Sequence, residues 1–182
     1  MEHKTNSLKI RCVIEDDRAV MPTKAHPSDI GFDLTAIDVF KKMSDKTTLF
    51  ETGIRVSPPP GYYIEILPRS SISKTGYVLA NSVGVIDPHY TGTLKIALTK
   101  VDDTRPNLEP PFNRCQIVLR KAEVSEMVQV DSIDVTDRGD GGFGSTDKHA
   151  LVESPQPNLP FLVHEVYNIG FQSIRNLTRQ LT

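Results

Sequence analysis

Alternation of apolar and polar residues in short runs constrains the fold of this chain more than any other feature. Alternation of this kind places successive side chains on opposite faces, as in a half-buried β-strand. Clusters of proline, glycine and aspartate separate the runs and are typical of turns. Many short strands joined by turns predict an all-β sandwich or barrel. The alternating runs cover residues 8–14, 62–67, 94–99, 116–121 and 127–135.

Composition narrows the class of protein. The chain has 182 residues, which fits one domain of ordinary size. Its formal net charge of -2 indicates neither a nucleic-acid partner nor a membrane-binding face. There is no signal-peptide pattern, and no apolar run approaches the roughly 20 residues that span a bilayer. We therefore expect an intracellular protein, cytoplasmic or nuclear.

Two isolated cysteines are expected to be reduced. Cys12 and Cys115 each lie among alternating apolar residues, which favours a place in the core or at a subunit interface. Neither has a neighbour at the spacing of zinc ligands, so a zinc site is not expected.

A glycine-rich segment at 137–146 indicates a ligand site. Four glycines surround Arg138 and Phe143, and the hydroxyls of Ser145 and Thr146 follow. Glycine at this density disfavours helix and strand but allows the backbone to approach a ligand closely. Free N–H groups, a guanidinium and a flat ring suit a molecule with phosphates at one end and a ring at the other. The pattern predicts a nucleotide.

Three further segments carry polar groups at strand ends. The segment 84–92 reads as a hairpin with Asp87 near its tip, where the carboxylate serves either chemistry or its own turn. The segment 68–76 places hydroxyls beside Arg69 and reads as an anion cradle or as a solvated turn. Asp33 lies between apolar neighbours and is either bonded structurally or directed at a cation or metal.

In order along the chain, these segments strongly resemble the trimeric dUTPase family. The resemblance rests on five motifs: Ile30-Gly31-Phe32-Asp33-Leu34, Pro68-Arg69-Ser70, the segment from Gly84 to Gly92, Arg114-Cys115-Gln116-Ile117-Val118, and the glycine-rich segment. It implies a jelly-roll-like β-barrel, a homotrimer, and sites built from more than one subunit. It divides the chain into a barrel at 1–137, an arm that closes the site at 138–147, and an extension at 148–182.

The resemblance also implies a role for each motif. The reaction would be hydrolysis of dUTP to dUMP and pyrophosphate, which keeps dUTP low and supplies dUMP for thymidylate synthesis. Asp87 would bind the deoxyribose 3′-hydroxyl or orient the attacking water, and the family's usual assignment is activation of that water as general base. Asp33 would position Mg²⁺ through water ligands. Tyr90 would lie under the deoxyribose and reject UTP. The other expected substrate-binding residues are Arg69, Ser70, Ser71, Asn81, Gly84, Val85, Ile86, Gln116, Arg138, Phe143, Gly144, Ser145 and Thr146.

The chain departs from the family's pattern in two ways. Ser71 stands where glycine is usual, the stretch to Lys74 is one residue short, and Gln116 follows Arg114 by two positions instead of three. An extension follows the arm: a proline-rich linker at 154–160 precedes apolar residues at helical spacing over 163–181. We expect a short helix there, which either packs on the protein or binds a partner.

Two other functions stay open at this point. A dCTP deaminase or its bifunctional relative shares segments such as Ile86-Asp87-Pro88, although the glycine-rich arm favours dUTPase. A non-catalytic nucleotide-sensing module on the same fold is the second. Release of ammonia from dCTP, or tight dUTP binding without pyrophosphate release, would distinguish them.

Overall fold

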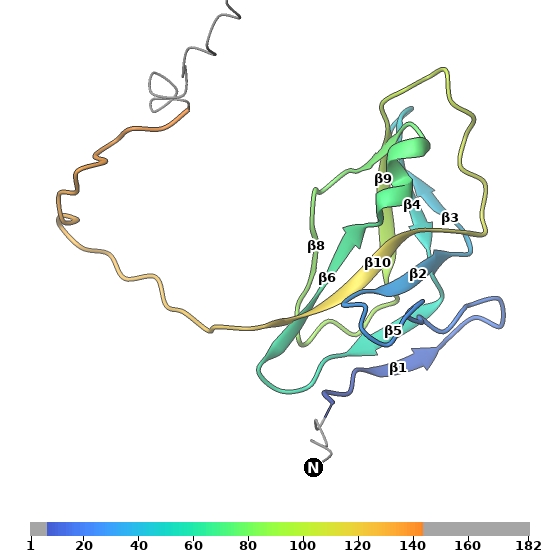
Figure 1. The fold of residues 1–182 in the computed structure, drawn as a ribbon, viewed down its shortest axis with the longest axis horizontal. Coiled ribbons are helices and arrows are strands. Elements are labelled where there is room, and N and C mark those ends of the chain that lie inside the picture. Colours follow the sequence, from blue (N-terminus) through green and yellow to red (C-terminus); the bar gives the residue numbers. More distant parts are fainter. Residues whose placement is uncertain (1–6, 144–182) are drawn as a thin grey trace, which may run out of the picture. The chain divides into compact units, whose positions relative to one another are not determined.

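The computed structural model describes residues 7–143, which form β-strands and one short 3-10 helix (Figure 1). The chain divides into two units, Met1–Met127 and Val128–Thr182, and all the strands belong to the first. The elements are β1 Arg11–Ile14, β2 Phe32–Ala36, β3 Asp38–Lys42, β4 Thr47–Glu51, β5 Ile54–Ser57, β6 Tyr62–Pro68, η1 Ser70–Lys74, β7 Tyr77–Leu79, β8 Gly84–Ile86, β9 Lys95–Lys100 and β10 Phe112–Lys121.

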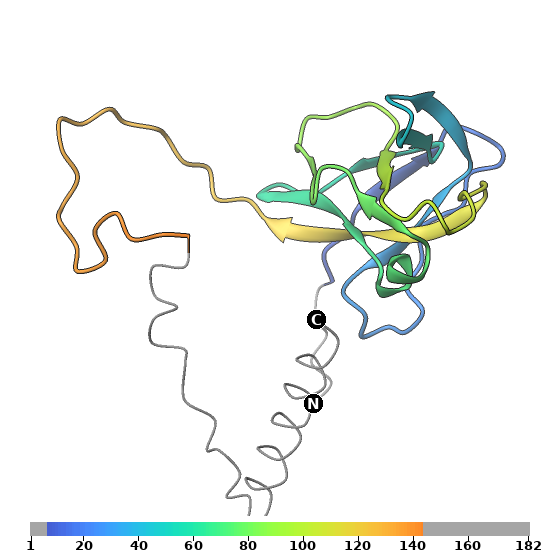
Figure 2. The same ribbon diagram turned by 90° about the horizontal axis from the view of Figure 1, so that it is seen from above.

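Two four-stranded antiparallel sheets build the barrel. One sheet has the order β2-β10-β6-β8 and the other β3-β4-β9-β7, while β1 and β5 form a separate pair. Figure 2 shows the long strand β10, in yellow, running along one side of the barrel. Neighbours in each sheet are mostly distant in sequence, as in a jelly roll. The expected all-β, jelly-roll-like fold is confirmed.

The core lies between the sheets and follows from the alternation. In β6, Ile64 and Ile66 are 0% and 2% exposed, whereas the alternate residues Tyr63, Glu65 and Leu67 are only half-buried. Phe50 of β4 meets Phe112 of β10 edge to face, with ring centroids 5.0 Å apart. Such a contact across the two layers adds to the area that the rings bury. Cys115 is buried and Cys12 half-buried, and both are free, as expected.

Two expectations about strands are wrong. Residues 127–135 form no strand, and Met127 is fully exposed. The segment 84–92 does not form a hairpin ladder with the next strand either. β8 pairs with β6, while β9 pairs with β4 and β7 in the other sheet. The turn after Ile86 therefore carries the chain from one sheet to the other.

The expected helix over 163–181 lies outside the described residues. Within the described part of the chain, no helix has the length and apolar character needed to cross a membrane.

Candidate functional site

Strand register brings three of the expected site residues together. Asp33 of β2 is directly opposite Gln116 of β10, which in turn is opposite Leu67 of β6. Arg69 follows β6 at the same end. The first, second and fourth motifs therefore form one cluster on the sheet, because β10 lies between β2 and β6.

Arg69 is held at three points before any ligand is present. Its guanidinium Nη1 lies 2.8 Å from Asp33 Oδ2 and donates to the carbonyl of Asn113 at 2.9 Å. Its backbone N–H donates to the carbonyl of Arg114, also at 2.9 Å. The register of β10 shifts between Phe112 and Cys115, and this irregularity turns both carbonyls toward Arg69. Of the alternatives for Asp33, the structure favours a carboxylate directed at a cation.

Gln116 contacts the main chain on both sides. Its Nε2 donates to the carbonyl of Pro68 at 3.2 Å. Its amide lies against Gly31, where a Cβ atom would overlap Oε1 and approach Cδ to 2.8 Å. Glycine at this position therefore allows the close approach of the Gln116 side chain. The amide of Gln116 supports the turn that precedes Arg69.

The segment after Arg69 forms the 3-10 helix η1 and not an irregular loop. The hydroxyls of Ser73 and Thr75 bond to carbonyls of their own turn. Ser70 is exposed, whereas Ser71 Oγ is buried without a hydrogen-bond partner among the described residues. The Nε atom of Arg114 is likewise buried and unpaired in that part of the chain. Ser70 is thus the serine of this segment best placed to meet a ligand.

The third motif lies at the other end of the same sheet. Gly84 is buried against Ile66, where a Cβ atom would lie 3.0 Å from Ile66 Cβ, and this close packing brings β8 onto β6. Asp87 follows β8 and is exposed, and no hydrogen bond reaches its carboxylate from the described residues. Its main-chain carbonyl accepts the N–H of Tyr90 at 3.0 Å. The turn is therefore made by the backbone, and the carboxylate is left available.

Thr93 and Gly92, both close to Tyr90 in sequence, orient the ring of Tyr90. Its hydroxyl donates to the carbonyl of Thr93 at 3.0 Å. The ring lies against Gly92, where a Cβ atom would overlap the hydroxyl.

The other expected residues of this region lie before and on β8. In the turn that precedes β8, Asn81 is exposed and its carbonyl accepts the N–H of Val83. Val85 is exposed and Ile86 half-buried.

Asp87 of the third motif is far from the Arg69 cluster, which consists of Asp33, Arg69 and Gln116, within one chain. Ile86, next to Asp87, pairs with Ile64, whereas Arg69 lies five positions further along the chain, about 16 Å at the usual rise of a strand. One chain therefore does not bring its Asp87 to its own Arg69.

Residues 138–143 of the expected arm, in the second unit, are described. Arg138 Nε donates to the carbonyl of Gly141 at 3.1 Å, and Gly139 adopts φ +52°, which favours glycine. Phe143 also has positive φ and a fully exposed ring. Gly144, Ser145 and Thr146 lie outside the described residues.

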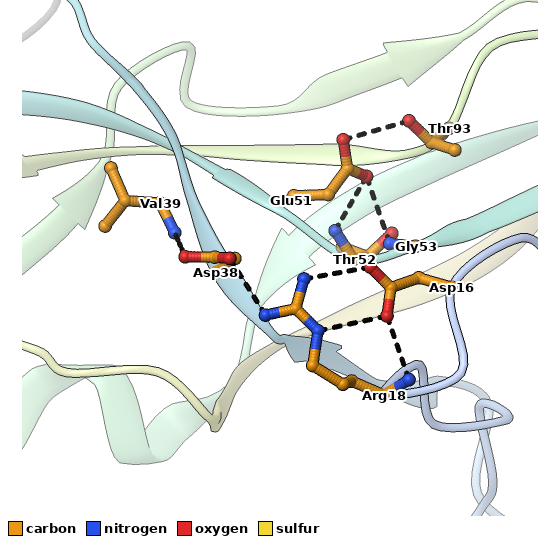
Figure 3. A network of polar contacts seen from close by, with 8 residues as sticks. All are labelled: Asp16, Arg18, Asp38, Val39, Glu51, Thr52, Gly53 and Thr93. Atoms are coloured by element: carbon orange, nitrogen blue, oxygen red, sulfur yellow. Dashed lines mark hydrogen bonds and ion pairs between the residues drawn. The ribbon is translucent and has the colours of Figure 1, made fainter.

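A carboxylate that sequence reasoning missed braces the region of Tyr90. Glu51 binds the hydroxyl of Thr93, and Figure 3 shows this contact beside the ion pairs of Arg18 with Asp16 and Asp38. Nothing near Glu51 in sequence points to this role, because Thr93 lies 42 positions away.

Comparisons with known proteins agree with this geometry. The dUTPase family model matches residues 17–147, which include all five motifs. A deoxyuridine 5'-triphosphate nucleotidohydrolase of Finegoldia magna is 38% identical over 74% of this chain and 96% of its own length. One of Mycobacterium leprae is 34% identical over 79% of this chain and 98% of its own.

Solved structures show the same fold. A mutant dUTPase of Staphylococcus bacteriophage 80alpha with dUpNHpp has a TM-score of 0.63 at 24% identity, covering 78% of this chain and 99% of that one. A mutant dUTPase of phage phi11 of S. aureus, solved to describe a structural Mg(II) ion, has a TM-score of 0.58 at 20% identity, covering 70% and 99%. At these identities the solved structures show the fold alone. The family is shown by the match of its model over residues 17–147 and by relatives above 30% identity. This chain therefore belongs to the dUTPase family.

Proposed function

We propose that this chain is a dUTP diphosphatase, which hydrolyses dUTP to dUMP and pyrophosphate. The observation that carries the proposal is the exposed carboxylate of Asp87, beside an oriented Tyr90 and without a hydrogen bond from the described residues. A general base must be free to take a proton from water, and a carboxylate engaged in its own turn would not be. Asp87 would accept that proton as the water attacks the α-phosphate.

The Arg69 cluster supplies the complementary part for the triphosphate. Arg69 presents a guanidinium fixed by the carboxylate of Asp33 and the carbonyl of Asn113, and Ser70 adds an exposed hydroxyl. A cation held in advance costs little ordering when anionic oxygens arrive. Gln116 would contact the triphosphate beside Arg69 and Ser70, with its amide already bonded to the carbonyl of Pro68. Arg138 and Phe143 would close the site from the arm, as a lid that excludes bulk water.

The residues present fit a magnesium ion held mainly by substrate. Among the described residues, no group of three His, Cys, Asp or Glu side chains could hold a metal by itself. Mg²⁺ at phosphoryl-transfer sites retains waters and takes one or two carboxylates besides the phosphates. Asp33, the half-buried carboxylate of the Arg69 cluster, would hold the ion through water. When bound, the ion would neutralise charge on the phosphate oxygens.

A homotrimer is part of the proposal, and two observations support a second copy of this chain. Asp87 and Arg69 are about 16 Å apart along β6, so a complete site needs Asp87 of one subunit and Arg69 of another. Between β10 and the arm, apolar side chains are exposed and pair with no strand of residues 7–143: Val124 is 100%, Met127 98%, Ile133 87% and Val135 99% exposed. Exposed apolar side chains in such number favour burial against another subunit.

Pyrophosphate release tests the reaction. We would measure it with dUTP, UTP, dTTP and dCTP, with and without Mg²⁺, and assay ammonia from dCTP in parallel. We expect turnover of dUTP alone. Asp87→Asn should lower turnover by two or more orders of magnitude while a non-hydrolysable dUTP analogue binds within a few-fold of the wild-type affinity. Unchanged turnover would remove Asp87 as the base, and ammonia release would favour a deaminase.

Mixed trimers test the sharing of the site. Asp87→Asn and Arg69→Ala subunits would be unfolded, mixed in equal amounts and refolded together. If each site combines residues of two subunits, about a quarter of the sites in random trimers carry both intact residues, and activity returns accordingly. Each variant refolded alone is the control. Absence of recovery in the mixture would mean that the site lies within one chain.

A further inference from the structure

The carboxylate of Glu51 connects three segments of the barrel. Its Oε1 accepts the backbone N–H groups of Thr52 and Gly53, both at 3.0 Å (Figure 3). Its Oε2 accepts the hydroxyl of Thr93 at 3.1 Å and lies 3.2 Å from the ammonium of Lys95. The side chain is 19% exposed, so these contacts replace most of its water. Both oxygens are used, and they bind the end of β4 to the start of β9.

Thr93 extends this network to Tyr90. The carbonyl of Thr93 accepts the Tyr90 hydroxyl at 3.0 Å and also lies 3.4 Å from Lys95 Nζ. The same ammonium donates to the Thr93 hydroxyl at 2.8 Å. Glu51 therefore fixes the residue that fixes the phenol, with one residue between them. The Tyr90 ring itself is 44% exposed, so few packing contacts are available to hold it.

Glu51 is suited to act as a fixed anion. Burial raises the pKa of its carboxyl, but the Gly53 N–H, the Thr93 hydroxyl and the Lys95 ammonium outweigh burial and hold that pKa below its ordinary value. The group is thus ionised at neutral pH, where it accepts hydrogen bonds at both oxygens. An ionised acceptor makes stronger hydrogen bonds than a neutral one and limits the positions open to its donors.

We propose that Glu51 is a positioning residue that sets the orientation of the Tyr90 ring and, through it, selection of the sugar. This inference rests on the proposed function, in which Tyr90 lies under the deoxyribose and leaves no room for a 2′-hydroxyl. A ring held at the wrong height would admit the ribose, so selection depends on the contacts that fix it. Glu51 touches neither substrate nor reacting atoms, and acts through Thr93.

The ratio of kcat/KM for dUTP to that for UTP is the measurement. Glu51→Gln keeps the size of the side chain but removes its charge and one acceptor. We expect the ratio to fall about five- to tenfold, as for one hydrogen bond lost, mainly through a higher kcat/KM for UTP. Thr93→Val, which deletes the hydroxyl and keeps the carbonyl, should lower the ratio in the same direction.

Glu65→Gln is the matched control. Glu65 is also largely buried, at 14% exposure, and its carboxylate binds Arg120 and Tyr63. A general loss of stability would affect both variants alike, whereas positioning of Tyr90 predicts an altered ratio for Glu51→Gln alone. An equal fall of the ratio in both variants would overturn the proposal.

A double variant and a spectroscopic readout complete the test. In a Tyr90→Phe background the hydroxyl is absent, so Glu51→Gln should change the ratio no further. Ring resonances of Tyr90, assigned with Tyr90→Phe, should shift in Glu51→Gln and stay in place in Glu65→Gln. Unshifted resonances in Glu51→Gln would overturn the inference whether or not the protein is active. Failure of the wild type to release pyrophosphate from dUTP would instead contradict the proposed function.

Discussion

Gly31→Ala probes the contact that supports the turn before Arg69. The new Cβ atom would overlap Gln116 Oε1 and lie 2.8 Å from Cδ and 3.2 Å from Cγ. Gly31 does not have a positive φ, so alanine fits its backbone, and the strain falls on the Gln116 side chain. That side chain must rotate away, and its 3.2 Å bond to the carbonyl of Pro68 is then lost.

The expected magnitude follows from opposing contributions. Loss of a neutral hydrogen bond costs about 0.5 to 1.5 kcal/mol, and an off-rotamer side chain costs about as much again. Replacement of glycine by alanine stabilises by about 0.4 to 1 kcal/mol, because the unfolded chain has fewer conformations to lose. We therefore expect Gly31→Ala to lower the free energy of unfolding by about 1 kcal/mol in the presence of Gln116.

A double-mutant cycle separates the contact from the backbone effect. In a Gln116→Ala background the overlapping atoms are gone, so Gly31→Ala should stabilise the protein by about 0.4 to 1 kcal/mol. The sign of the effect therefore reverses, and the coupling energy is about 1.4 to 2 kcal/mol, within the range for residues in contact. Gly142→Ala, a site with no atom within 4 Å, is the control for alanine in open space.

Urea unfolding of the four proteins of the cycle is the assay. All would be measured at one protein concentration, because the unfolding midpoint of an oligomer depends on it. Equal slopes with shifted midpoints would show a change in stability alone. If Gly31→Ala destabilises equally with and without Gln116, the contact is not the cause and the reasoning fails.

Two further predictions concern the contact of Arg18 with Asp16 and the contact of Gly92 with Tyr90. Hydrogen bonds from the Arg18 side chain and backbone hold the pKa of Asp16 at about 2, below its ordinary 3.8, so the stabilisation from this contact is complete above pH 3.8 and is lost as the pH falls through 2. The difference in stability between wild type and Arg18→Ala, measured by thermal unfolding, should therefore shrink across that window. A constant difference would refute the prediction. Gly92→Ala would place a Cβ atom 2.7 Å from Tyr90 Cζ and displace the ring; the kinetic preference for dUTP over UTP should fall at least several-fold, and an unchanged preference would contradict the role of Gly92.

Strands could be predicted where one sheet face is buried within the chain. The alternation around Ile64 and Ile66 marks β6 to within a residue, because both side chains enter the core of the same molecule. The same pattern at 127–135 predicted a strand that the structure does not contain. Alternation shows that one face of a segment is suited to burial, and it does not show which chain provides the cover.

Sheet membership could not be predicted from local pattern. Ile86 and Asp87-Pro88 followed by a strand read as a hairpin, but the next strand belongs to the other sheet. The contacts that hold Arg69 and Glu51 were also beyond sequence reasoning. Asn113 and Thr93 approach them from 44 and 42 positions away, through a carbonyl and a single hydroxyl that no motif marks. The residue types indicated the chemistry of the site, whereas the contacts that hold these residues in place follow from the topology of the sheets.

Topology also supports the proposal that a second copy of the chain completes this site. Asp87 follows β8, whose Ile86 is opposite Ile64, and Arg69 follows the far end of β6, whose Ile64 and Ile66 are 0% and 2% exposed. A rearrangement of β6 that drew both isoleucines out of the core to bring the two residues together within one chain would cost about 1.5 to 3 kcal/mol for each side chain. A general base must nevertheless lie within hydrogen-bond reach of the water it activates, about 2.6 to 3.2 Å. In the proposed homotrimer, association of folded subunits would meet this requirement without disturbing the core, because Asp87 of one copy would approach Arg69 of the next while β6 stays in place.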